Sequence, residues 1–451
     1  MNDRDAAGSR AQRTPLTVLA IATVSGFIAR VWVVWYGSGH DFAVDHLFDT
    51  LAWNLVSLHA FTLDGLNPAA HVGPLYPALL AVFYAFVGHR PEWVPVLHIV
   101  FDLAAAFCIY RVGTLLWGSW TGACAAGLFI LYPAYWTYDP RIRSEALLTL
   151  LVSGWLWAAV MCVRLPSVRQ YLVAGVLAGL TILCKPVVLI LACLLLGLVL
   201  IGSFPPSRKL VYAGVYLAAS FVVLTPWSVR NYVMFHEVIP VSAGMGAGLW
   251  MGSDPVSRGS WPMPAERESA IWESAGITPL PYAHAMYEVS TDRLLREKGW
   301  NRIKADPLGY VGLTATRGWD FWIGNQFYLV NTEDGFVRGF QRDAAERGWL
   351  VAAYSLFKRL LFMPCLIMAA SWSAWRHRER WRELSPLYLF PIGLTLGYVP
   401  FTVEAGRYAL PVLPCLMVLS VALVVRLVKT QSFLVSGQSC PSETSVSWHM
   451  N

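Results

Sequence analysis

Long apolar runs separated by short polar segments dominate this sequence of 451 residues. Runs of about 20 apolar residues with few charges are long enough to cross a lipid bilayer as helices. Only 14% of the residues are charged, whereas soluble globular proteins carry about a quarter. The charges lie between the apolar runs rather than along them. The sequence therefore predicts an all-α polytopic membrane protein, a helical bundle with about ten transmembrane helices.

The orientation of the bundle follows from its basic residues, because short cytoplasmic loops carry an excess of lysine and arginine. Three arginines in the first 13 residues place the N-terminus in the cytoplasm, and the segment RHRERWR, Arg376–Arg382, marks a cytoplasmic loop. The basic residues after the last run place the C-terminus there too. The predicted spans are roughly Leu16–Trp35, Val94–Tyr110, Thr121–Tyr135, Ala146–Val163, Val173–Leu183, Val187–Ile201, Val211–Leu224, Val351–Ser371, Leu387–Phe401 and Tyr408–Val425.

A further apolar run, Leu75–Val87, is the weak point of this topology. If it crossed the bilayer, every later helix would be reversed and RHRERWR would face outward. Short apolar runs also occur as interfacial or re-entrant segments. We therefore predict that Leu75–Val87 lies on or dips into the outer face.

The predicted topology divides the chain into five parts. They are a cytoplasmic tail (residues 1–15), a seven-helix membrane module (16–226) with a first outer loop of interfacial helices (36–90), an extracytoplasmic mixed segment (227–350), three C-terminal transmembrane helices (351–428) and a second cytoplasmic tail (429–451).

The first outer loop contains acids beside a stretch with helical apolar spacing, residues 47–58. Asp45 and Asp49 are four residues apart and share the polar face of the expected helix, and Asp41 precedes them by one turn. These acids could simply solvate an interfacial helix. Alternatively, a carboxylate here could accept a proton from an acceptor hydroxyl or hold a divalent metal, for which Asp45 is the candidate ligand.

Charged residues also mark four helix ends on the predicted outer side. In the second outer loop, Arg143 and Glu145 flank Ser144, which could cap the next helix, with Glu145 favourable in its first turn. Lys185 precedes Pro186 and breaks an apolar stretch, so it either snorkels or binds an anion.

Two later cations fall on the same side. Arg230 follows the seventh span and could be an interfacial anchor, and Arg407 in the last outer turn could pair with Glu404. Cations at three helix ends oppose the usual charge bias. A cationic pocket for a lipid phosphate, beside carboxylates for acid–base work, would explain why they share this side.

The sequence does not indicate a structural zinc site, a nucleic-acid-binding surface or a nucleotide-binding loop. Seven of the eight cysteines lie in or beside apolar runs, and no spacing of Cys and His indicates structural zinc. No dense basic patch with interleaved aromatics indicates nucleic-acid binding, and no glycine-rich loop indicates a phosphate cradle for nucleotides.

Several blocks of sequence resemble one known family. They are D-x-x-F-x-x-x-A-x-N-L (Asp45–Leu55), GPLYPALLAVFYAFVG (Gly73–Gly88), RSEALL (Arg143–Leu148), AGLTILCKP (Ala178–Pro186), PWSVRN with its G-x-x-L-W-x-G continuation (Pro226–Pro255) and GRYALPVLPCL (Gly406–Leu416). Together they resemble the GT-C glycosyltransferases, family 39-like, of the protein-mannosyltransferase and aminoarabinose-transferase type.

The resemblance implies a shared seven-helix module, a polyprenyl-phosphate-linked sugar donor and inversion at the anomeric carbon. It assigns acidic roles to Asp45 and Glu145 and matches the family's basic and Arg-Tyr positions with Lys185, Arg230, Arg407 and Tyr408. The first loop departs from the family because it offers Asp41 and Asp45 instead of an Asp-Glu pair, and Phe48 instead of Tyr. The acceptor is therefore left open among glycan, lipid and protein.

The combined hypothesis is a displacement in which an acceptor hydroxyl attacks the sugar as polyprenyl phosphate leaves. The expected catalytic residues are Asp41, Asp45 and Glu145, and the expected donor-phosphate ligands are Arg143, Lys185, Arg230, Arg407 and Tyr408. We expect membrane-lipid partners, no nucleic acid, and a bacterial inner membrane with the site on the extracytoplasmic face. The alternatives are a transporter or flippase of lipid-linked sugars, or a noncatalytic membrane subunit.

Overall fold

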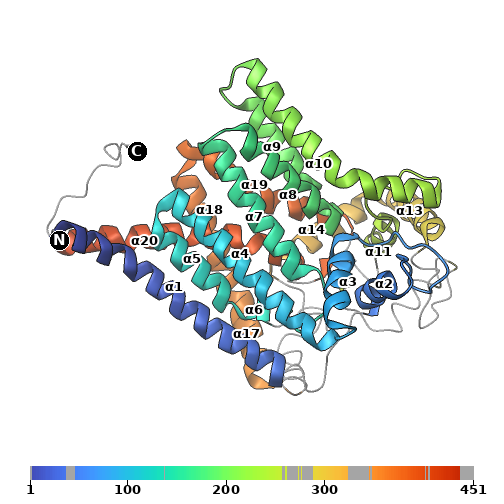
Figure 1. The fold of residues 1–451 in the computed structure, drawn as a ribbon, viewed down its shortest axis with the longest axis horizontal. Helices are drawn as coiled ribbons and strands as arrows, with labels where there is room; N and C mark the ends of the chain where they lie inside the picture. Colours follow the sequence, from blue (N-terminus) through green and yellow to red (C-terminus); the bar gives the residue numbers. More distant parts are fainter. Residues whose placement is uncertain are drawn as a thin grey trace.

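The structure is a computed structural model, and it describes residues 3–36, 46–136, 138–255, 260–261, 273, 276, 288–323, 345, 348–401, 403–404 and 407–436. Within these residues the chain is almost entirely helical, as predicted, and most helices lie side by side in one bundle (Figure 1). Two strands of two residues each, β1 (Ser260–Trp261) and β2 (Val403–Glu404), pair in parallel.

The helices have the following bounds. They are α1 Asp3–Tyr36, α2 His46–Ser57, α3 Leu75–Val87, α4 Val94–Trp117, α5 Ser119–Leu131, α6 Pro133–Trp136, α7 Glu145–Arg164, α8 Val168–Cys184, α9 Ile190–Ile201, α10 Pro206–Phe235, α11 Met245–Gly252, α13 Val289–Ala305, α14 Pro307–Ile323, α17 Trp349–Phe357, α18 Met363–Arg376, α19 Trp381–Tyr398 and α20 Leu413–Ser436. Short 3₁₀ helices include η3 Pro186–Leu189, η6 Arg378–Arg380 and η7 Leu410–Val412, and a π-helical turn, η5 Lys358–Phe362, joins α17 to α18.

The bundle has two chemically different ends. At one end Arg30, near the end of α1, pairs with Asp102, near the start of α4. At the other end Arg380 of η6 donates a hydrogen bond to the carbonyl of Leu116, in the last turn of α4. We call the first the polar end, which also contains Glu145, Lys185 and Arg407. We call the second the basic end, which contains the RHRERWR segment.

The short helix α3 does not add a crossing between the two ends of the bundle. Since α1 ends and α4 begins at the polar end, the segment between them starts and finishes on one side. At about 1.5 Å per residue, a helix of 13 residues also falls short of a hydrocarbon core about 30 Å thick. Gly73, just before α3, packs against the backbone at the end of α8, which fixes α3 at the polar end. The arrangement agrees with the prediction for Leu75–Val87.

Ten helical segments of the described chain run between the two ends: α1, α4, α5, α7, α8, η3 with α9, α10, α17 with α18, α19 and α20. Five of them are long and apolar enough to cross a membrane by length and composition alone. The helix α1 lies along one side of the bundle, and most of its side chains face outward.

Three predicted boundaries were wrong. The helix α10 continues to Phe235, so PWSVRN lies inside it and Pro226 does not end it. The helix α5 ends at Leu131, because Pro133 cannot continue it and starts the short α6 instead. The helix α19 begins at Trp381 and ends at Tyr398 rather than spanning Leu387–Phe401.

A helical cap made of α11, α13 and α14 covers the polar end. Asp292 of α13 accepts a hydrogen bond from the backbone N–H of Gly246 in the first turn of α11, at 2.7 Å. Arg317 of α14 is fully buried and donates to the carbonyl of Val399 at 2.6 Å, at the end of α19. The cap is therefore joined to the membrane bundle where α19 ends.

Candidate functional site

Glu145 is the centre of a charged cluster at the polar end. It is the first residue of α7, and only 3% of it is exposed. Its Oε1 accepts a hydrogen bond from Arg407 Nε at 2.6 Å and lies 3.5 Å from Lys185 Nζ. The structure thus brings together three of the predicted site residues, of which Glu145 and Arg407 are 262 residues apart in the chain.

Lys185 reaches this cluster because α8 stops immediately before it. Lys185 has extended backbone angles, φ −153° and ψ 109°, and Pro186 then starts η3. The ammonium lies 4.4 Å from the centre of the Tyr408 ring and 5.5 Å from that of Tyr398. A cation over aromatic rings is stabilised without being fully neutralised.

The aromatic wall of the cluster comes from two helix ends. Tyr398, the last residue of α19, stacks on Tyr408 with ring centres 4.3 Å apart. Tyr408 also lies beside Arg407, whose guanidinium carbon is 5.6 Å from its ring centre. The predicted Tyr408 is therefore part of the cluster, and Tyr398, which the sequence interpretation missed, completes it.

Among its described residues, the cluster contains more cations than carboxylates, and one carboxylate oxygen accepts no hydrogen bond. Lys185 and Arg407 together carry two positive charges against one on Glu145. The second carboxylate oxygen of Glu145, Oε2, is buried and has no hydrogen-bond partner among the described residues. Arg143, two residues earlier, adds another cation beside it. Such an arrangement can hold an anion and still position it against a carboxylate.

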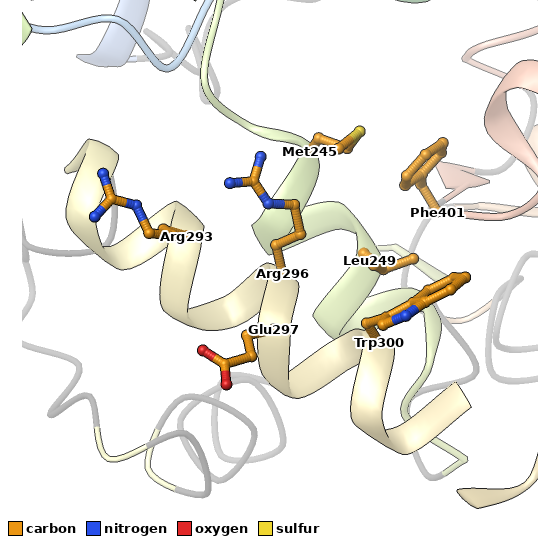
Figure 2. A pocket seen from close by; sticks show the side chains of 7 residues that line it. All are labelled: Met245, Leu249, Arg293, Arg296, Glu297, Trp300 and Phe401. Carbon is orange, nitrogen blue, oxygen red and sulfur yellow. The ribbon is translucent and has the colours of Figure 1, made fainter. Parts of the chain in front are cut away.

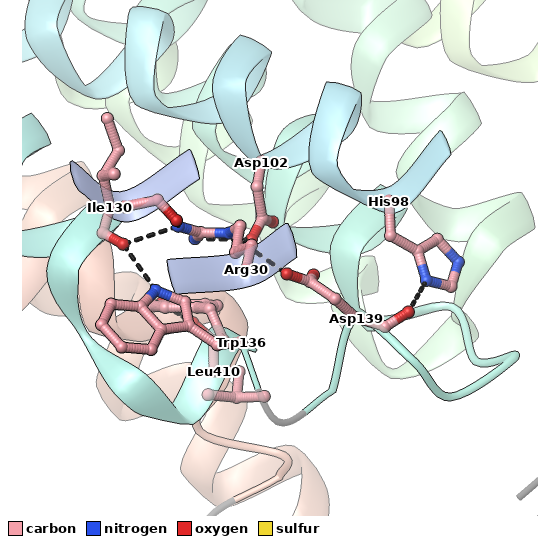
Figure 3. Close-up of polar contacts among 9 residues, drawn as sticks. Arg30, His98, Asp102, Ile130, Trp136, Asp139 and Leu410 are labelled. Carbon is pink, nitrogen blue, oxygen red and sulfur yellow. Dashed lines mark hydrogen bonds and ion pairs between the residues drawn. The ribbon is translucent and has the colours of Figure 1, made fainter. Parts of the chain in front are cut away.

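A second buried cluster supports the loop that carries Glu145 (Figure 3). Arg30 is 1% exposed and pairs with Asp102 at 3.0 Å and with Asp139 at 3.1 Å. It also donates to the carbonyl of Ile130 at 2.7 Å, which accepts a second hydrogen bond from the indole of Trp136. Arg30 thus fixes the α5–α7 connection, six residues before Glu145.

His98 holds the same loop from the other side. Its Nδ1 lies 2.9 Å from the carbonyl oxygen of Asp139, which can only accept, so Nδ1 carries the hydrogen. The hydroxyl of Tyr76 on α3 then donates to Nε2 at 2.8 Å. Burial raises the pKa of Asp139 well above its usual range, and the neighbouring Asp102 raises it further, against the opposing effect of Arg30. If Asp102 and Asp139 shared one proton, their remaining single negative charge would balance the positive charge of Arg30.

Asp49 of the first outer loop is not a solvated surface acid, so that reading was wrong for this residue. It is 7% exposed and accepts a hydrogen bond from the Tyr84 hydroxyl at 2.6 Å. His89 lies 3.1 Å from its other oxygen and stacks on Trp53. Asp49 therefore joins α2 to the end of α3. Asp41 and Asp45 lie outside the described residues.

Arg230 contacts the first outer loop. Its guanidinium donates to the carbonyl of Ala69 at 2.8 Å and to that of Phe61 at 3.3 Å. It also lies over the ring of Trp227, 4.8 Å from its centre. These contacts bind the end of α10 to the loop between α2 and α3, and none of them joins Arg230 to Lys185 or Arg407.

One further prediction about a helix end was tested by the geometry, whereas the side chain of Glu404, the predicted partner of Arg407, lies outside the described residues. The Ser144 side chain makes no capping hydrogen bond to α7, so the capping reading of that residue was wrong. Arg407 pairs with Glu145 across the bundle.

Arg30 was not predicted, although an arginine within an apolar run is a signal for a buried partner.

A metal site does not emerge from the described part of the chain. No group of three or more His, Cys, Asp or Glu residues there could hold a metal ion. The predicted metal ligand, Asp45, is not among the described residues.

Part of the sequence matches a known protein family. Residues 71–230 match the family model described as dolichyl-phosphate-mannose-protein mannosyltransferase. This segment contains Glu145, Lys185 and Arg230. No curated protein matches the sequence at a significant level.

Among solved structures, the oligosaccharyltransferase of Archaeoglobus fulgidus in its apo form has a TM-score of 0.56 at 14% identity, covering 95% of this chain and 53% of the other. The same organism's oligosaccharyltransferase AglB, in complex with an inhibitory peptide and a dolichol-phosphate, has a TM-score of 0.53 at 13% identity, covering 94% and 51%. The chain thus spans about half the length of these proteins.

ArnT from Cupriavidus metallidurans, bound to undecaprenyl phosphate, gives a TM-score of 0.37 at 14% identity, covering 93% and 81%, which is too low to support an inference. The chain therefore shares its fold with part of the oligosaccharyltransferase, and over residues 71–230 it resembles the dolichyl-phosphate-mannose-protein mannosyltransferase family, which confirms the predicted resemblance there.

Proposed function

We propose that this protein is an inverting membrane glycosyltransferase that moves a sugar from a polyprenyl-phosphate-linked donor to an acceptor hydroxyl. The observation that supports this most is the cluster in which Glu145 holds Lys185 and Arg407 side by side at the polar end. The match of residues 71–230 to a family named for a dolichyl-phosphate sugar supports the same donor class.

Lys185 and Arg407 would bind the donor phosphate and stabilise the charge that develops on it as it leaves. Fixed cations in a poorly hydrated site are effective there because they need no reorganisation during the reaction. Glu145 would keep both cations in place and so act as a positioning residue. This changes its role from the catalytic acid expected from the sequence.

The chemical step requires a base, and Asp45 is our candidate. The acceptor oxygen forms a bond to C1 of the sugar while the bond between C1 and the phosphate oxygen breaks. The hydroxyl proton goes to the Asp45 carboxylate, and polyprenyl phosphate leaves with the bonding electrons. Since the oxygen attacks from the face opposite the leaving group, the configuration at C1 inverts. A divalent metal at Asp45 would lower the charge of the leaving phosphate, but no step proposed here depends on it.

We place the polar end on the extracytoplasmic side, in the plasma membrane of a bacterium. This follows from the basic end, where Arg376, Arg378, Arg380 and Arg382 gather as expected for a cytoplasmic loop. Lipid-linked sugars then supply the donor without a nucleotide. The acceptor class is a glycan, a lipid or a protein.

Binding of the leaving group tests the phosphate site without knowledge of the sugar. Undecaprenyl phosphate should bind the purified full-length protein, and Lys185→Gln or Arg407→Gln should each weaken the binding by about tenfold or more, because a charge-assisted contact contributes roughly 1.5–3 kcal/mol. Lys185→Arg should retain most of the affinity. Lys209→Gln is the matched control, since Lys209 lies at the basic end and donates to the carbonyl of Leu200.

Transfer of labelled sugar in detergent then tests the reaction. Asp45→Asn should reduce transfer by about 10²–10⁴ while binding of undecaprenyl phosphate is unchanged. Undiminished transfer by this variant would remove Asp45 from the mechanism. A flippase would bind the same lipid but transfer nothing in detergent with any member of a panel of polyprenyl-phosphate sugars, and that result would reject the proposed activity.

A further inference from the structure

A pocket of about 470 Å³ lies in the cap, between α11, α13 and the end of α19 (Figure 2). Its walls are formed by Met245 and Leu249 of α11, Trp300 of α13, and Phe401. The interior is almost entirely apolar. Its volume falls in the range of small-molecule sites, about 300–1,000 Å³. An occupant must therefore bring a substantial apolar portion.

Charged residues of α13 lie at the mouth of the pocket, and not all of them are paired within the described structure. Arg293 pairs with Glu237, and Asp292 is engaged with α11. Arg296 has no ion pair or hydrogen bond among the described residues. Figure 2 shows Arg296 extending towards Met245, while Glu297 points to the other side of α13. The pocket lining thus contains two arginines and one acid, and of the two arginines Arg293 is paired with Glu237 whereas Arg296 has no ion pair among the described residues.

The surroundings of the pocket are typical of a membrane–water interface. Trp300 is 52% exposed, and on the neighbouring α14 Leu308 is 83% and Trp319 is 63% exposed. Exposed tryptophans beside basic residues are characteristic of helices at the headgroup level. The helix α13 carries five basic and two acidic residues, which favours anionic lipid.

We propose that this pocket binds an anionic phospholipid of the surrounding membrane, with its apolar part against Leu249, Trp300 and Phe401 and its phosphate at Arg296. The apolar interior disfavours a free sugar or inorganic phosphate, and the cation distinguishes anionic from zwitterionic headgroups. This site is separate from the donor-phosphate site at Lys185, so the inference goes beyond the proposed transferase activity.

One pocket residue, Phe401, lies close in sequence to the candidate active site. Phe401 lies three residues after Tyr398 and six before Arg407, and its carbonyl packs closely on Gly252 of α11. A bound lipid would hold this segment against the cap.

Native mass spectrometry of the detergent-purified full chain tests the proposal. The probes are dioleoyl phosphatidylglycerol and dioleoyl phosphatidylcholine, which have the same acyl chains and differ in net charge. We expect the anionic lipid to bind about tenfold more tightly, and Arg296→Gln to abolish that preference. Met245→Trp, which fills the pocket at a half-exposed position, should weaken binding of both lipids.

Lys298→Gln is the matched control, because Lys298 lies on the same helix with the same charge but does not line the pocket. It should leave the preference unchanged. Equal binding of the two lipids, or a preference that survives Arg296→Gln, would overturn the proposal. Displacement of the phospholipid by glycerol 3-phosphate would instead indicate a site for a soluble anion, and displacement by undecaprenyl phosphate would assign the pocket to the donor; either result rejects it.

Discussion

At the scale of single residues, Arg30 illustrates how an expensive charge is accommodated inside the bundle. A charged side chain buried in a membrane protein is costly unless it is paired. Arg30 is matched with two acids and a backbone carbonyl, so each of its partners depends on it. Removing one member of such a group leaves an uncompensated buried charge.

Arg30→Met should therefore destabilise the protein by about 3–5 kcal/mol, the usual cost of breaking a buried ion pair from one side. Methionine keeps much of the volume, so the loss reports on charge rather than on a cavity. The measurement is thermal unfolding of the purified protein in detergent. Adding Asp102→Asn to Arg30→Met should recover part of the loss, and an unchanged melting temperature in Arg30→Met would contradict the role of this cluster.

Some features of the candidate-site residues could be predicted from the sequence, and others could not. Glu145, Lys185 and Arg407 were predictable because each interrupts an apolar run or opens one on the same predicted side. Their pairing was not, since Glu145 and Arg407 are 262 residues apart and meet only through the packing of α7 against η7, while α8 brings Lys185 to them. Tyr398 lay at the end of an apolar span, where an aromatic residue has no distinctive pattern.

At the scale of elements, small residues determine how closely helices approach. The helices α8 and α10 make the most extensive contact in the described bundle. A methyl group added at Gly175 would meet the carbonyl of Tyr216 and the side chain of Ala219. Gly214, on the same α10, has nothing near the position of an added methyl. Glycine at a helix contact permits close packing, whereas at an open position it only lowers helix propensity.

Gly175→Ala should consequently destabilise the protein by about 1–3 kcal/mol, because the methyl overpacks a close backbone contact. Gly214→Ala makes the same chemical change without a neighbour and should be neutral or slightly stabilising. Melting temperatures of the two variants in one detergent provide the comparison. Equal effects of both substitutions would mean that propensity rather than the α8–α10 contact determines the result.

Element boundaries were harder to predict than element positions. The helix over residues 46–57 followed its apolar spacing closely. PWSVRN was expected to follow the seventh span at the outer boundary, and α10 runs through it to Phe235. Arg230 and Trp227 contact the first outer loop near the end of that helix, and such tertiary contacts leave no local pattern.

At the scale of the whole molecule, the two ends of the bundle differ in chemistry. The polar end joins carboxylates, cations and tyrosines, and the basic end is held by arginines such as Arg164, which pairs with Glu383. Because α1 ends and α4 begins at the polar end, the segment that contains α3 starts and finishes at that end. The proposed orientation in the membrane depends on the difference between the two ends, since a site that faced the cytoplasm would place RHRERWR outside.

Cysteine accessibility in intact cells tests that orientation. Leu66 is 87% exposed in the loop between α2 and α3, and Arg378 is exposed in η6. A membrane-impermeant maleimide should label Leu66→Cys in intact cells and Arg378→Cys only after lysis. The unsubstituted protein gives the background from its native cysteines. Labelling of Arg378→Cys alone in intact cells would reverse the assignment.

The position of Arg30 on the first helix also constrains how the chain is assembled during synthesis. Its partners Asp102 and Asp139 are translated later, the second more than about 100 residues afterwards, which at roughly 5–20 residues per second is a delay of several seconds or more. During that interval α1 has few apolar contacts to hold it and a cation near its outer end, where the side chain can reach the headgroups. Final docking of α1 must therefore wait for the α5–α7 connection, although α1 is translated well before it.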